Sequence, residues 1–327
     1  MSAQAIPPES NDLLAPGQRD RLRARSSLMG AWLVLHAWGV ILASAALFVL
    51  WPSPWTYALA VVLIGGRQLG LAILMHDAAH RLLFERASTN DRVGAWLCGD
   101  PIGASLTAYR PYHLQHHRHT QQAGDPDLAL SAPFPITRRS LGRKVMRDLL
   151  GVTGYQRRRA QFLAAMGAEG SLPQRMARLW QRERGFFVSN LALLGLATAA
   201  GVWWAYFALW LLPMMTWYQL ISRIRNIAEH AVVPDDADRL RNTRTTLTNP
   251  LMRAVLAPYW VNYHLEHHLF VFTPCWKLPA AHRLLVARGL RDRMEVERGY
   301  LRVLRRATSA REDGPRQGRQ ARAVSHI

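Results

Sequence analysis

Cysteine is scarce in this sequence, with two among 327 residues, Cys98 and Cys275. They lie far apart, and neither belongs to a C-x-x-C pair. This scarcity argues against a disulfide framework and against a zinc or iron–sulfur site built from cysteine ligands. We interpret both as ordinary thiols.

Acidic residues are also few, with 22 Asp and Glu against 41 Lys and Arg, so the formal net charge is +19. So positive a chain suits nucleic acid, anionic lipid or an acidic partner. We exclude nucleic acid because the sequence contains no recognisable nucleic-acid-binding motif. Half of the residues are apolar, yet the mean hydropathy is only -0.07. Strongly apolar and strongly polar segments must therefore alternate.

Both ends of the chain are polar. Residues 1–27 carry alternating arginines between positions 19 and 25 and have no apolar core, unlike a cleavable signal peptide. We predict a disordered basic arm there and a disordered tail at residues 309–327, which are rich in Arg, Gly and Gln. Residues 28–308 are expected to form one domain.

Long apolar segments predict an all-α, integral membrane fold with about four transmembrane helices. The expected spans are residues 28–50, 55–75, 186–201 and 202–221. The first is long enough for a hydrocarbon core of about 30 Å. The alternative is that these segments are buried helices of a soluble protein.

The distribution of basic residues predicts the orientation. Of all Lys and Arg, only Arg67 lies within an expected span. By the positive-inside rule, both termini and the polar regions 81–185 and 222–308 are cytoplasmic. Apolar residues three and four apart in 149–166 and 172–180 indicate helices, so we expect a helical cytoplasmic cap.

Histidine is abundant on this predicted cytoplasmic side. Ten of the 13 histidines lie in four short clusters. The clusters are His76-x-x-x-His80, His113-x-x-His116-His117-x-His119, Asn226-x-x-x-His230 and His264-x-x-His267-His268. Residues four apart share a helix face, so each cluster can direct several imidazoles to one place. We interpret the other three, His36, His282 and His326, as structural or exposed.

Eight or nine imidazoles exceed what one ion can bind, so the clusters predict two metal ions in one cavity of the cap. Carboxylates at ligand spacing are lacking, which argues against the Glu-x-x-His di-iron site of soluble proteins. Imidazole ligands alone allow Zn, Cu, Ni or Fe, although zinc normally takes three or four ligands. A nitrogen-rich dinuclear site beside a membrane favours iron and O2 chemistry.

Two other classes of protein remain as alternatives. A membrane metal-binding or transport protein would place ionisable ligands inside its spans, whereas these clusters lie at or beyond the span ends. A membrane zinc hydrolase would need fewer histidines and a carboxylate base.

Together, the first, second and fourth clusters resemble the three histidine boxes of the membrane fatty acid desaturase and hydroxylase superfamily, over roughly residues 28–288. The resemblance implies two non-haem iron ions and their eight ligands. These are His76, His80, His113, His116, His117, His264, His267 and His268. It also implies His230 as a ninth ligand, with Asn226 contacting a metal through water.

Several neighbouring residues are expected to support the centre. His119 extends the second box. We expect it either to donate a hydrogen bond to a ligand or to be exposed, and the alternative is that it is itself a ligand. Other side chains could orient ligand imidazoles through the second ring nitrogen. These are Asp77, Asp125, Asp127, Glu229 and Glu266.

Arg67 is an unusual charge inside a span, about 13 Å along the helix from His76. We hypothesise that Arg67 and Gln68 face a polar pocket near the substrate tunnel. The alternative is a structural pair between Arg67 and an interior carbonyl.

The resemblance also implies a reaction, in which O2 and two electrons oxidise an unactivated C–H bond of a membrane lipid or acyl substrate. Fatty acid desaturation is the first expectation, and lipid hydroxylation or carotenoid ketone formation is the alternative. The sequence has no G-x-G-x-x-G loop or cytochrome-like segment. We therefore expect a separate ferredoxin-like or cytochrome b5-like electron donor, which the basic cytoplasmic surface would suit. That charge could equally serve anionic lipid headgroups.

Overall fold

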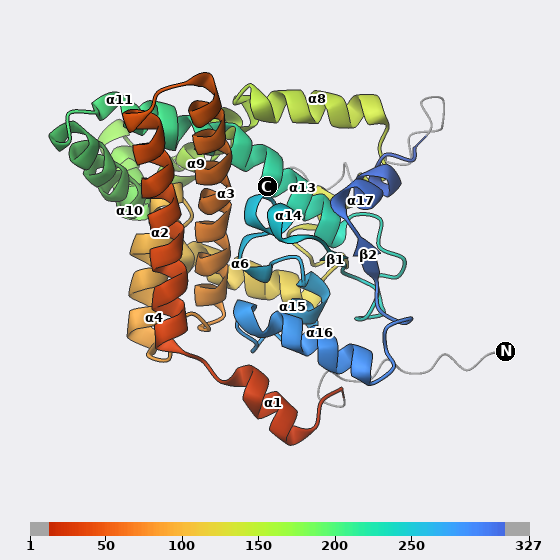
Figure 1. Cartoon of the computed structure of the whole chain (residues 1–327). Coiled ribbons are helices and arrows are strands. Elements are labelled where there is room, and N and C mark those ends of the chain that lie inside the picture. Colours follow the sequence, from red (N-terminus) through yellow and green to blue (C-terminus); the bar gives the residue numbers. More distant parts are fainter. Residues whose placement is uncertain (1–12, 311–327) are drawn as a thin grey trace.

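Two long antiparallel helices lie side by side in the computed structural model, which describes residues 13–310 (Figure 1). Helices α2 (Ser27–Leu50) and α3 (Pro54–Ala79) are, among those residues, the two that are long and apolar enough to cross a membrane. In its most apolar stretch, α3 is 67% buried and α2 only 28%. Thus α3 is the inner helix, and α2 presents an apolar outer face.

Local sequence explains where these two helices begin. The hydroxyl of Ser26 accepts a hydrogen bond from the N–H of Met29 at the start of α2. Ser53 accepts from the N–H of Thr56 at the start of α3, where Pro54 occupies the first helical position. Such caps satisfy N–H groups that a helix start leaves without partners.

The other elements are mostly short helices. The α-helices are α1 (Pro16–Arg23), α4 (Ala87–Val93), α5 (Asp100–Ile102), α6 (Leu106–His119), α7 (Leu128–Ser131), α8 (Arg138–Leu149), α9 (Val152–Met166), α10 (Leu172–Ala199), α11 (Trp203–Ala205), α12 (Leu212–Met215), α13 (Trp217–His230), α14 (Pro250–Val255), α15 (His264–Leu269), α16 (Leu278–Ala287) and α17 (Tyr300–Ala307). Two π-helices, η1 (Gly94–Gly99) and η2 (Tyr206–Leu211), and two 3-10 helices, η3 (Pro258–Trp260) and η4 (Cys275–Lys277), complete the helical part.

Within residues 13–310, one small sheet interrupts this helical fold. Strand β1 (Thr245–Leu247) pairs in parallel with β2 (Val296–Arg298), and Thr245 lies opposite Val296. The prediction of a mostly helical protein is thus confirmed.

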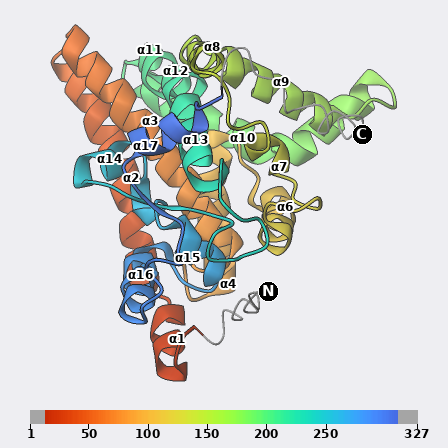
Figure 2. The same ribbon diagram turned by 90° about the vertical axis from the view of Figure 1, so that its right-hand side faces the viewer.

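Helices α6 and α13 pack against α3, and α6 also lies close to η1 (Figures 1 and 2). Gly94 at the start of η1 permits a close approach to the end of α3. A Cβ atom there would lie 2.3 Å from the Cβ of Ala78, so any other residue would separate the two segments. Elements distant in sequence therefore meet around the C-terminal end of α3.

The predicted disordered N-terminal arm is wrong for its described part. Residues 16–23 form α1, which Figures 1 and 2 place beside α16. Leu13, Leu14 and Leu22 are buried in a cluster with apolar residues of α15 and α16. The sequence interpretation weighed the arginines and missed these apolar contacts. Residues 1–12 of the arm and residues 311–327 of the predicted tail lie outside the described residues.

The boundaries predicted for the second pair of spans also differ from the structure. The segment 186–201 is the apolar second half of α10, which begins 14 residues earlier, at Leu172. The segment 202–221 is divided among α11, η2, α12 and the start of α13. Thr216 interrupts the helix with φ -120° and ψ -86°. The charged first half of α10 concealed its continuity from a reading based on apolar runs.

Candidate metal centre

Helices α3 and α6 supply five of the nine predicted ligands. His76 lies in the last turn of α3, and His80 is its C-cap residue. Near its C-terminal end α6 carries His113, His116 and His117. Residues four apart share a helix face and adjacent residues do not, so His113 and His117 point together while His116 points elsewhere.

Helices α13 and α15 supply the other four. His230 is the last residue of α13, and the short α15 carries His264, His267 and His268. The same spacing pairs His264 with His268, whereas the adjacent residue His267 is rotated away from His268.

The nine imidazoles divide into two groups, and within each group one ring nitrogen per residue lies within 4.8 Å of the others. The group of five contains His76, His80, His113, His117 and His267. The group of four contains His116, His230, His264 and His268. All are buried except His80 and His117, which are half-buried.

Ring nitrogens of the group of five converge as the ligands of one ion do. Nε2 of His117 lies 2.9 Å from Nε2 of both His113 and His267. Two nitrogens bound at right angles to an ion, each at about 2.1 Å, would be about 3.0 Å apart. Both ring nitrogens of His76 and Nε2 of His80 are buried without a hydrogen-bond partner. Because burying such atoms unsatisfied is costly, a bound metal fits this cavity.

The group of four has the same spacing and a defined tautomer. Nε2 of His264 lies 2.9 Å from Nε2 of His230 and 3.0 Å from Nε2 of His268. The hydroxyl of Thr120 donates to the carbonyl of His116 at 2.8 Å and lies 3.1 Å from Nδ1 of His268. Thr120 has one hydrogen to donate, so its oxygen accepts from Nδ1–H of His268. The lone pair on Nε2 of His268 is then available to a metal.

A buried carboxylate orients His116. Nδ1 of His116 lies 2.8 Å from Oδ1 of Asp125. The same carboxylate accepts the N–H of Asp127 at Oδ1 and the N–H of Gln121 at Oδ2. Burial acts to raise the pKa of Asp125, but these hydrogen bonds outweigh it, so the pKa is lowered. The carboxylate therefore holds Nδ1–H of His116 and directs Nε2 into the group of four.

Burial favours the neutral form of most of these imidazoles. Removal from water, assisted by neighbouring positive charges, lowers the pKa of His80 to about 4. The same causes lower the pKa of six others well below the ordinary value. These are His113, His117, His230, His264, His267 and His268. Neutral rings offer lone pairs, and in the described part of the chain both groups are histidine alone, which suits two divalent transition-metal ions.

Comparison with known proteins identifies the family. A family model described as fatty acid desaturase matches residues 52–296, an interval that contains all nine histidines. The chain belongs to the fatty acid desaturase family.

The similar proteins of this family are named for different reactions. Dihydrorhizobitoxine desaturase of Bradyrhizobium elkanii is 27% identical, covering 79% of this chain and 75% of the relative. A beta-carotene ketolase of Paracoccus sp. is 26% identical, covering 78% and 88%. The sn-1 oleoyl-lipid 12-desaturase of Synechocystis sp. is 24% identical, covering 70% and 68%. At such identity the family is shared, but a reaction does not transfer.

Two of the other predicted orienting carboxylates have different partners in this desaturase-family protein. Asp77 accepts the N–H of Cys275 at 2.9 Å, and its other oxygen is 3.8 Å from Nδ1 of His76. Asp127 accepts the hydroxyl of Tyr112 and stays 3.8 Å from Nδ1 of His116.

Both glutamates are likewise engaged elsewhere. Glu229 lies 2.7 Å from Nε of Arg225 and 3.6 Å from Nδ1 of His264, too far for a hydrogen bond. Glu266 accepts the hydroxyl of Thr245 and lies 2.6 Å from Nδ1 of His282. The structural interpretation of His282 fits this contact. His326 lies outside the described residues.

Two lower-ranked ligand candidates are also placed. His119 belongs to neither group, and its ring lies over Gly124, where a Cβ atom would be 3.0 Å from the ring. Asn226 is half-buried one turn before His230 on α13, and its amide makes no hydrogen bond within residues 13–310. A metal role for Asn226 stays a prediction.

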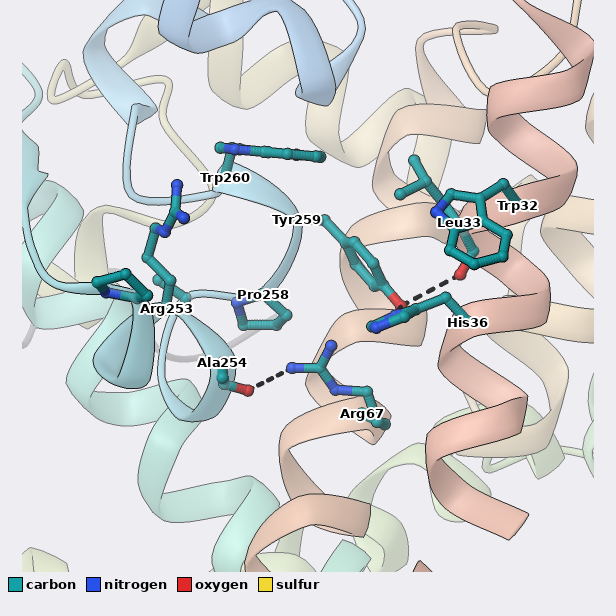
Figure 3. Close-up of a pocket in the computed structure, with 11 residues that line it drawn as sticks. Trp32, Leu33, His36, Arg67, Arg253, Ala254, Pro258, Tyr259 and Trp260 are labelled. Carbon is teal, nitrogen blue, oxygen red and sulfur yellow. Dashed lines mark hydrogen bonds between the residues drawn. The ribbon is translucent and has the colours of Figure 1, made fainter. Parts of the chain in front are cut away.

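The structure separates Arg67 from Gln68. Arg67 lines a pocket of about 270 Å³ and donates to the carbonyl of Ala254, so both the pocket and the carbonyl contact are present (Figure 3). Gln68 is fully buried and donates to the carbonyl of Trp210 at 2.8 Å, away from that pocket. Gln68 does not line this pocket, and a place for Gln68 in a polar pocket near the substrate stays a prediction.

Sequence reasoning missed two hydroxyl partners of the imidazoles. The hydroxyl of Tyr109 lies 3.2 Å from Nδ1 of His113, and Thr120 binds His268. Tyr109 precedes His113 by four residues, and this helical spacing was a usable signal. Thr120 meets His268 from 148 positions away in the sequence, so no local spacing indicated that contact.

Proposed function

We propose that this protein is an integral-membrane oxidoreductase that uses two iron ions and O2 to oxidise an unactivated C–H bond of a lipid acyl chain, with desaturation as the principal reaction. The carrying observation is the pair of all-histidine groups, five and four, within a desaturase-family chain. All nine histidines would be ligands, and Asn226 would contact one ion through water.

The chain prepares this site before any metal binds. When bound, the two iron ions supply the reduction of O2 and the removal of hydrogen from the substrate. Neutral imidazoles leave the ions their positive charge, while Asp125 and the hydroxyls of Thr120 and Tyr109 hold three rings in place. Burial of most ligands excludes water from the reacting region.

A membrane location is supported by the outer face of α2. Leu28, Trp32, Leu35, Leu42 and Leu50 are each at least 60% exposed, which suits contact with lipid chains rather than with water. We propose four crossings, made by α2, α3, the second half of α10 and the segment 202–221.

Aromatic and basic residues support an orientation for these crossings. Trp51 and Trp55 at the α2–α3 turn and Trp203 at the start of α11 are exposed, as interfacial tryptophans are. The basic residues avoid these turns. We therefore propose that both termini and the metal centre are cytoplasmic.

Electrons are proposed to come from a separate ferredoxin-like or cytochrome b5-like protein. The surface helix α8 carries five basic residues and one acidic residue, which would complement an acidic donor. The same helix would also suit anionic headgroups.

Lipid mass profiles of host cells test the function. Cells expressing the native protein are compared with cells expressing His117→Ala, and His119→Ala is the control because it lies outside both groups. Desaturation is supported if lipids lacking two hydrogens form in cells with the native protein and with His119→Ala but not in cells with His117→Ala. No product from the iron-loaded protein given reductant, O2 and lipid would refute the proposal.

Hydroxylation or ketone formation is the second candidate, because the Paracoccus relative is named a ketolase. Lipids that gain one oxygen would assign hydroxylation, and a gain of one oxygen with loss of two hydrogens would assign ketone formation. Metal transport is less well supported, since the histidine groups gather at the C-terminal end of α3 rather than along it.

A further inference from the structure

A cationic pocket lies apart from the nine histidines of the two groups, between α2, α3 and residues 250–260 (Figure 3). Its volume is about 270 Å³. Aromatic and proline side chains form much of its wall, among them Trp32, Pro258 and Trp260. Two arginines, Arg67 and Arg253, provide its charge, and no acidic residue of the described chain lines it.

Arg67 is buried without a counter-charge. Its side chain is 6% exposed, donates to the carbonyl of Ala254, and lies 5.4 Å from the ring centre of Tyr259. Within residues 13–310 it forms no ion pair. Arg244, which is 1% exposed, is instead paired with Glu295 at 2.9 Å. A buried, unpaired guanidinium is costly and is normally compensated by an anion.

The pocket has spare donors for such an anion. A guanidinium carries five N–H groups, and the bonds of Arg67 to the carbonyl of Ala254 and to the hydroxyl of Tyr259 leave others available. Arg253 is half-buried and also forms no ion pair within the described residues. The hydroxyl of Tyr259 donates to the carbonyl of Leu33, so His36 Nδ1 donates to Tyr259 and adds no negative charge.

The backbone of the pocket is held in an uncommon conformation. Tyr259 and Trp260 have φ values of 52° and 57°, a left-handed region that bulky residues rarely adopt. Such strain persists where surrounding packing enforces it and is concentrated at ligand sites. Gly70 on α3 enables this packing, because a Cβ atom there would lie 2.8 Å from the Tyr259 ring.

Two segments connect the pocket with the metal centre. Arg67 precedes His76 by nine residues on α3, which corresponds to about 13 Å along the axis. Trp260 precedes His264 by four residues. An extended molecule anchored at Arg67 therefore needs a chain on the order of 13 Å to reach the level of the first ligand.

We propose that this pocket binds the carboxylate of an amphiphilic substrate whose apolar chain extends toward the metal centre. The protein would then act on a free carboxylic acid rather than on an ester-linked acyl chain. A planar carboxylate matches the guanidinium fork and carries the single negative charge that Arg67 lacks. The assignment of this ligand as the substrate rests on the proposed oxidation of acyl chains.

Ligand binding without turnover tests the pocket. The full chain in nanodiscs of zwitterionic lipid is titrated with labelled hexadecanoate, then competed with unlabelled hexadecanoate, methyl hexadecanoate or phosphatidylglycerol. The native protein should prefer the acid to the ester by about tenfold or more, because charged hydrogen bonds in a dry site are strong. Arg67→Gln should abolish this preference and leave ester binding unchanged, whereas Arg67→Lys should retain much of it.

Arg239→Gln is the matched control, since it removes the same charge from an exposed position outside the pocket. Equal binding of acid and ester by the native protein would overturn the proposal, as would an unchanged preference in Arg67→Gln. Displacement of the acid by phosphatidylglycerol would assign the pocket to a lipid headgroup and also overturn it. If Arg67→Gln does not fold, the preference for acid over ester in the native protein and in Arg67→Lys still tests the proposal. The binding assay contains neither O2 nor reductant, so its result does not depend on whether the protein oxidises the ligand.

Discussion

The two histidine groups lie side by side but are held in different ways. In the group of four, His116 is bound by Asp125, and His268 by Thr120. In the group of five, His76 and His80 rely on their positions at the end of α3, and their Nε2 atoms have no protein partner. Hydrogen bonds to side chains thus orient two of the four histidines in one group, and one of five, His113, in the other.

The group of four is also the more deeply buried of the two. Every histidine in the group of four is buried, whereas the group of five includes the half-buried His80 and His117. Rings fixed by hydrogen bonds in a dry site have little freedom to reorganise. We therefore infer that the group of five is the more accessible side of the centre, where small molecules enter.

The largest expected effect comes from removing one ligand at a time from each group, at two adjacent positions. His116 and His117 are neighbours on α6 but belong to different groups. His116→Ala and His117→Ala should each lower bound iron from two ions per chain toward one and reduce product formation by about a hundredfold or more. Metal analysis of the purified proteins and a product assay measure both quantities.

His119→Ala is the control, because this residue on the same helix lies in neither group. It should retain two ions and near-native activity. If His116→Ala and His117→Ala keep two ions, the division into two metal sites is wrong.

A smaller effect is expected from the carboxylate beside the group of four. Asp125→Asn keeps the shape but removes the charge that holds Nδ1–H of His116, so metal affinity should fall by about 10- to 100-fold. Competition with a chelator measures this change. Asp236→Asn, at an exposed position, is the control and should leave affinity unchanged. Equal affinities for Asp125→Asn and the native protein would refute the orienting role.

The smallest effects come from the two hydroxyls, one for each group. Thr120→Val removes the acceptor for His268, and Tyr109→Phe removes the partner of His113. One neutral hydrogen bond contributes about 1 kcal/mol, so each change should weaken metal binding by about fivefold. Chelator titration of each variant should show loss from the group of four for Thr120→Val and from the group of five for Tyr109→Phe. Loss from the opposite group in both variants would contradict the assignment.

Much of the site was predictable because its chemistry is local. Histidines three and four residues apart mark helix faces, and all nine predicted histidines meet in the structure. The apolar stretches of α2 and α3 were equally evident. The course of α10 and the helix at Pro16–Arg23 were not, because charged residues obscured apolar contacts made with distant segments.

By itself, the sequence determined the helical character, the two long apolar helices and the histidines that gather, since each depends on spacing within one segment. The tertiary structure alone decided how the nine histidines divide into five and four, because that requires α3, α6, α13 and α15 to meet. It also decided that Asp125, rather than the other four predicted acids, holds an imidazole of the two groups, whereas Glu266 holds His282. A carboxylate finds its partner through distance and direction in space, and these are set by packing between segments far apart in the chain.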